Sequence, residues 1–115
     1  MRDAIRRVTV VVQPSRTGPD GDAESLLLVN LEGQASGRPV ITTRHGGIPE
    51  FVDDSTSLVV EEGDADALAA ALVRVLTDRS LAERLGAAGP AWASQFDVRV
   101  CTARVDDLYE AVLAR

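Results

Sequence analysis

Two kinds of apolar pattern alternate along this chain. Short runs rich in β-branched residues lie at Val8–Gln13, Pro39–Thr43 and Leu58–Val60. The first run is continuous rather than alternating, which is typical of a strand that is covered on both faces in a parallel sheet. Several turn-forming residues gather at Thr17–Asp22, where we expect a loop. The sequence therefore predicts three short strands.

Between and after these runs, apolar residues recur every three or four positions, which predicts amphipathic helices. The first helix is expected from about Ser25 to Ser36, with Gly37 as the left-handed residue that follows it. A brief helical turn is expected at Ile48–Glu50. Asp64 predicts the cap of a longer helix, and Ser80–Glu83 is a capping box that predicts the start of the next.

A last helix is expected from about Asp97, because one uninterrupted apolar stripe follows it. The stripe consists of Val98, Cys101, Val105, Leu108 and Val112. We expect Cys101 to be a buried, inert thiol. The aromatic residues Trp92, Phe96 and Tyr109 are expected to anchor the last two helices in the core.

The predicted order of elements is β-α-β-α-β-α-α-α, which specifies an α/β fold with a parallel sheet and right-handed crossovers. Three strands make half of a Rossmann-like doubly wound sheet, so residues 1–115 are interpreted as a single partial domain. In such folds the ligand lies outside the carboxyl ends of the strands. The segments to examine are therefore Ser15–Leu28, Arg44–Glu50 and Glu61–Asp64.

Charge narrows the choice of function. The 115 residues carry a formal charge of −6, and all twelve basic residues are arginines. This overall charge argues against binding to nucleic acids or to an anionic lipid surface. The absence of lysine excludes Schiff-base chemistry, a phosphate-loop lysine and the lysine of receiver-like signalling domains.

One cysteine, Cys101, cannot form an intramolecular disulfide, and with a single histidine the chain cannot build a Cys/His zinc site. We therefore expect no metal site and a cytoplasmic location. The longest apolar stretches are much shorter than the ~18 residues of a membrane span. His45 follows a predicted strand at the expected ligand face, where it is either a ligand contact or a plain polar residue.

Glu24 and Glu32 are the most informative acidic pair. Glu24 lies where the long loop enters the first helix, beside free backbone N–H groups and the positive end of the helix dipole. Glu32 comes four residues after Leu28, which places it beside the apolar stripe. A half-buried carboxylate there needs donors, and sugar hydroxyls are suitable ones. Alternatively, Glu24 is an ordinary helix N-terminal acid and Glu32 reaches solvent or an arginine.

The spacing of these two glutamates resembles the Glu-x7-Glu motif of the retaining, family 4 type glycosyltransferases of the GT-B fold. Further segments over nearly the whole chain are similar to that family in the same order. The matching segments are Val11–Ser15, Glu24–Glu32, Gln34–Ile41, Thr43–Glu50 and Leu58–Asp64. The resemblance identifies the chain as the second half of a nucleotide-sugar-binding domain, the C-terminal domain of a GT-B glycosyltransferase.

That resemblance implies a role for each site residue. Glu24 would face the donor sugar as the catalytic residue, and Glu32 would hold ribose hydroxyls. The backbone amides of Ser25, Leu26, Leu27 and Leu28 would bind the diphosphate of a nucleoside diphosphate sugar, with no other cofactor and no metal. Leu27 departs from the family, which favours Gly or Pro there, so a side chain stands where backbone approaches phosphate.

The family's basic diphosphate-binding residues and its acceptor-binding domain are not encoded in this chain. Activity of the chain by itself is therefore left open, and the expected partner is the missing N-terminal half or a partner chain. The alternative is a non-catalytic remnant or a partner-dependent binding half-domain. Because one edge of the Val8–Gln13 strand would lack its neighbour, we expect the isolated chain to be marginally stable or to self-associate.

Overall fold

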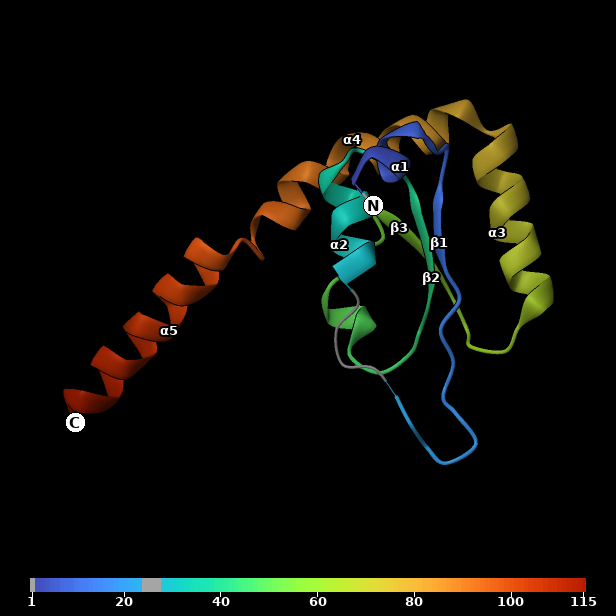
Figure 1. Ribbon diagram of the computed structural model, residues 1–115. Coiled ribbons are helices and arrows are strands. Elements are labelled where there is room, and N and C mark those ends of the chain that lie inside the picture. Colours follow the sequence, from blue (N-terminus) through green and yellow to red (C-terminus); the bar gives the residue numbers. More distant parts are fainter. Residues whose placement is uncertain (1, 24–27) are drawn as a thin grey trace.

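The computed structural model describes residues 2–23 and 28–115. It contains a three-stranded parallel sheet with helices on both faces (Figure 1). The strands are β1 (Val11–Gln13), β2 (Val40–Thr43) and β3 (Ser57–Val60), in the spatial order β1-β2-β3. Val12 pairs with Ile41, and Ile41 pairs with Leu58. The predicted α/β class and its three parallel strands are confirmed.

The amino-terminal element is a helix that the sequence did not reveal. α1 (Arg2–Arg7) precedes β1, and the predicted first strand begins at Val11 instead of Val8. Its single buried residue, Ile5, packs with Val11 and Val40 on one face of the sheet. A six-residue helix has too few residues to show a clear apolar period, which explains why it escaped notice.

α2 (Leu28–Ala35) covers the same face of the sheet as α1. Its buried Gly33 lies directly against β1 and β2, because a Cβ at this position would stand 3.1 Å from a methyl group of Val11 and of Val40. That contact distance is tighter than ordinary side-chain packing, so any side chain here would push α2 away from the sheet. The lack of a side chain at Gly33 therefore lets α2 lie close to the sheet.

α3 (Ala65–Thr77) covers the opposite face. Asp64 caps it as predicted, with the side chain accepting a hydrogen bond from the Ala67 N–H at 2.9 Å. Ala71 and Val75 of α3 form a buried cluster with Ile41 of the central strand. The two helical layers thus leave β2 buried along its whole length.

α4 (Arg79–Ser94) crosses the end of the sheet and packs against both α2 and α3. The predicted capping box was wrong, because Asp78 is the cap and accepts from the Leu81 N–H at 3.0 Å. Glu83 instead pairs with Arg79 at 3.2 Å. Gly89 lets α4 lie against the backbone of α2, since a Cβ there would approach the Gln34 carbonyl oxygen to 2.4 Å.

α5 (Val98–Leu113) extends away from the rest of the molecule (Figure 1). None of its residues is buried, and Tyr109 is 66% exposed, so the prediction that Tyr109 anchors the core was wrong. Trp92 and Phe96 do pack together, with ring centroids 5.9 Å apart, and the Trp92 Nε1–H donates to the Phe51 carbonyl at 3.0 Å. Cys101 is half-buried rather than buried.

No helix in the described part of the chain is both long enough and apolar enough to cross a membrane. β1 is hydrogen-bonded to β2 and, among the described residues, to no other strand. The predicted consequence of that free edge, marginal stability or self-association, stays a prediction.

Candidate functional site

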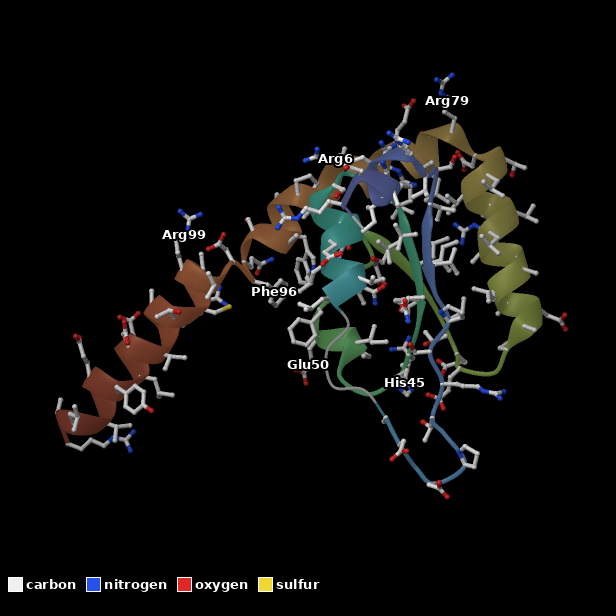
Figure 2. The ribbon with its side chains drawn as sticks, in the orientation of Figure 1. Arg6, His45, Glu50, Arg79, Phe96 and Arg99 are labelled. Carbon is white, nitrogen blue, oxygen red and sulfur yellow. The ribbon has the colours of Figure 1, made fainter. Side chains whose placement is uncertain are left out.

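The loops that follow the three strands meet at the carboxyl end of the sheet, where the sequence predicted the ligand. Figure 2 shows His45 and Glu50 at this end of the molecule. One hollow of about 200 Å³ is lined by residues at or just after the ends of all three strands, among them Pro14, Thr43 and Glu61. A second, of about 370 Å³, lies between Ser15, Asp22 and His45.

Hydrogen bonds fix the start of the loop after β1. The Thr43 hydroxyl donates to the Ser15 carbonyl at 2.5 Å, and the Thr42 hydroxyl donates to the Gln13 carbonyl at 3.1 Å. The Asn30 side-chain amide in turn donates to the Thr42 hydroxyl at 3.1 Å. These hydrogen bonds connect α2, through Thr42 of β2, to Gln13 at the end of β1.

Glu62 joins two of the loops. One carboxylate oxygen accepts from the Thr17 N–H at 3.1 Å, and the other lies 3.0 Å from Nδ1 of His45. These hydrogen bonds, first that of His45 and then that of Thr17, hold the pKa of the Glu62 carboxyl below its usual value. The His45 side chain is 1% exposed, so it supports the loops rather than projecting into solvent.

Glu62 falls in the segment Glu61–Asp64 to which the sequence pointed, but no role in the site was predicted for it. Its neighbour Glu61 is solvated charge, since it forms an exposed ion pair with Arg44 at 2.9 Å. Glu62 and His45 are 17 positions apart, and they meet because they follow the adjacent strands β3 and β2. The rule that carboxyl ends of parallel strands converge was the available signal.

Glu32 lies on α2 and is half-buried, as its place beside the apolar stripe predicted. Its Oε2 atom is buried and has no hydrogen-bond partner within residues 2–23 and 28–115. Glu32 lines a hollow of about 240 Å³ together with Ile5 and Arg6 of α1. A buried carboxylate oxygen without a donor is costly, so this atom is suited to receive a hydroxyl from a ligand.

The other predicted site residues are only partly placed. Leu28, the first residue of α2, is 61% exposed. Glu24, Ser25, Leu26 and Leu27 lie outside the described residues, so their proposed roles stay predictions. In the part of the chain that the structure describes, no group of three His, Cys, Asp or Glu side chains could hold a metal ion.

An open parallel sheet, flanked by helices and with loops converging at its carboxyl end, is the architecture of the C-terminal domain of GT-B glycosyltransferases. Sucrose-phosphate synthase from Thermosynechococcus elongatus matches 92% of this chain with a TM-score of 0.75 and 33% identity, over 26% of its own length. HepE of Anabaena, solved in complex with UDP, matches 94% of the chain and 29% of its own length with a TM-score of 0.81. At 23% identity, HepE shows the fold alone.

The family model for glycosyl transferases group 1 matches residues 1–78. The chain therefore belongs to the group 1 glycosyltransferase family. Residues along 79% of it are 41% identical to a GDP-mannose-dependent monoacylated alpha-(1-6)-phosphatidylinositol monomannoside mannosyltransferase of Corynebacterium glutamicum, and cover 24% of that protein. It is 35% identical over 99% of its length to D-inositol 3-phosphate glycosyltransferase of Streptomyces griseus, covering 23% of that protein. The chain thus spans about a quarter of the length of these curated relatives.

Proposed function

We propose that this chain is the second half of the donor-binding domain of a retaining glycosyltransferase that uses a nucleoside diphosphate sugar. The observation that carries the proposal is the buried, unpartnered Oε2 of Glu32 on the helix that follows β1. Ribose hydroxyls are neutral donors of the right kind for this atom, and a hydrogen bond to a carboxylate is about twice as strong as one between neutral groups.

In this proposal Glu24 faces the donor sugar, and the amides of Ser25 to Leu28 hold the diphosphate. The leaving diphosphate gains negative charge in the transition state. Backbone N–H groups fixed at the start of a helix stabilise that charge without having to reorganise. The network of Asn30 and Thr42 supports this role, because it holds α2 in a set position relative to the strand ends.

The proposal leaves the donor nucleotide to experiment. The mannosyltransferase relative is GDP-mannose-dependent by its name, whereas HepE was solved with UDP. Acceptor binding and the basic groups for the diphosphate are proposed to reside in the remainder of a longer chain or in a partner. A half-domain that only binds a partner is the second candidate, and it is favoured by the edge of β1 that pairs with no strand of the described residues.

A thermal melt of the chain with millimolar UDP, GDP or ADP tests nucleotide binding, because a ligand that binds the folded state alone raises the melting midpoint. We expect a shift with one nucleotide and a loss of most of that shift in Glu32→Gln. The matched control is Glu110→Gln, an exposed glutamate on α5 (Val98–Leu113). Equal shifts in both variants would return Glu32 to a structural role, and no shift with any nucleotide would favour the partner-binding half-domain.

A further inference from the structure

A second concave surface lies at the opposite end of the sheet from the proposed donor site. It encloses about 580 Å³, more than either hollow at the carboxyl ends of the strands. Three segments line it: the end of α1, the turn before β2 and the first turns of α4. Figure 2 shows Arg6 and Arg79 at this end of the molecule, far from His45. We call it the amino-end hollow.

Arginine dominates the charge of the amino-end hollow. Arg6, Arg7, Arg38 and Arg79 line it, against one carboxylate, Glu83. Glu83 forms an ion pair with Arg79 at 3.2 Å, so Arg6, Arg7 and Arg38 have no carboxylate partner among the described residues that line the hollow. A third of the chain's arginines thus gather in one place on a protein whose formal charge is −6. Four arginines around one concavity, with a single carboxylate among them, give it a local positive charge that attracts anions.

Arg38 gives an independent sign of a missing acceptor. Its Nη2 donates to the Arg6 carbonyl oxygen, which fixes the guanidinium between α1 and the turn before β2. Its Nε is buried and has no hydrogen-bond partner among the described residues. A buried donor attached to a charged group is costly when nothing accepts from it, and Arg38 is one of the residues that line the hollow.

We propose that the amino-end hollow binds a phosphate-bearing anion. Guanidinium groups match the geometry of phosphate oxygens with paired N–H donors, and several arginines around a concavity can surround a compact diphosphate or phosphate monoester. A free phosphate compound and a phospholipid headgroup share this chemistry. The amino-end hollow differs from the hollow of Glu32 in its lining, because Arg7, Arg38 and Arg79 line only the former and Arg6 lines both.

Calorimetric titration with inorganic pyrophosphate tests the proposal on the 115-residue chain. We expect the double variant Arg7→Gln/Arg79→Gln to weaken binding by about tenfold or more, the loss expected when charge-assisted contacts are removed. Binding should also weaken as salt is raised. The matched control is Arg104→Gln/Arg115→Gln, which removes the same charge from exposed positions at the far end of the chain. Melting midpoints verify that both pairs remain folded.

Sedimentation with phosphatidylcholine vesicles, with and without phosphatidylglycerol, separates the two sources of phosphate. Pyrophosphate binding that depends on Arg7 and Arg79, without sedimentation, identifies a free phosphate compound. Sedimentation that needs both the anionic lipid and these arginines identifies a headgroup. Either result supports anion binding in the amino-end hollow. Equal effects of the two double variants, or no binding to either probe, overturns it. The nucleotide melt is separated from this test by Glu32→Gln, because a shift caused by phosphate binding in the amino-end hollow would persist in that variant, whereas a shift caused by the donor site would be mostly lost.

Discussion

α4 and α5 are two helices of the same length that differ in whether their residues are buried. Each has 16 residues, an aspartate cap and an apolar stripe. α4 buries Leu81 and Leu85 in the core and lies against α2, whereas α5 buries none of its residues. The apolar period therefore predicts that a helix forms and which side is apolar, but it does not show what covers that side.

The difference between them is made by glycines and by contacts distant in sequence. α4 carries Gly86 and Gly89, where a Cβ would stand within 2.5 Å of a backbone oxygen of the chain around α2. α5 has no glycine in its sequence and keeps large apolar side chains such as Leu108 exposed. Glycine at the contact lets α4 approach α2 closely, and α5 carries no glycine.

The largest contrast should come from shortening one leucine in each helix. Leu85→Ala in α4 removes a side chain that is 3% exposed, so we expect a loss of about 2–5 kcal/mol in the free energy of unfolding. Leu108→Ala in α5 changes a side chain that is 64% exposed and should alter it by about 0.5 kcal/mol or less. Urea unfolding of both variants measures this. A comparable loss from Leu108→Ala would show that α5 is packed in solution.

The helix contact itself is tested by Gly89→Ala. The added methyl would lie 2.4 Å from the Gln34 carbonyl oxygen, so the backbones of α4 and α2 must separate. We expect a loss of about 1–3 kcal/mol, the usual range for overpacking, even though alanine favours helices. Ala91→Ser, at an exposed position of the same helix, is the control and should change stability by about 0.5 kcal/mol. A stabilised Gly89→Ala variant would contradict the close approach.

The strands and long helices were predictable because each carries its own local pattern. Val8–Gln13 gave the first strand, and Asp64 gave the start of α3. α1 was missed because six residues show no period, and the cap of α4 was misplaced because two candidate caps, Asp78 and Ser80, stand two residues apart. The exposure of α5 could not be predicted, since a sequence pattern does not identify its partner.

The site was less predictable than the fold. The half-burial of Glu32 followed from its helical position beside the stripe. The pairing of Glu62 with His45 and the gathering of Arg6 and Arg38 depend on the order of the strands and on how α1 packs. The formal charge of −6 argued against binding to nucleic acids or anionic lipids. A total charge does not show where the twelve arginines lie.

Removing the cap of α4 and the cap of α5 should produce a smaller difference in stability than shortening a leucine in each helix. Asp78→Ala removes an acceptor for the Leu81 N–H in a helix that packs on the core, so we expect a loss of about 1 kcal/mol in global stability. Asp97→Ala removes the acceptor for the Arg99 N–H in α5. Because α5 contributes no buried residue, we expect fraying of its first turn with an unchanged unfolding midpoint. Amide hydrogen exchange distinguishes local from global loss.

The smallest expected effect is a response of α5 to acid. The Arg99 side chain and backbone N–H both bind the Asp97 carboxylate and hold its pKa below the usual value. A carboxyl whose pKa is lower in the folded state stabilises that state above its unfolded pKa, and the contribution is lost as pH falls through the lowered one. Exchange of the Arg99 amide should therefore quicken, relative to its intrinsic rate, only at acidic pH below the unfolded value. Asp97→Asn keeps a good helix cap but cannot titrate, so it should abolish this response. An unchanged acid response in Asp97→Asn would show that another group controls the first turn of α5.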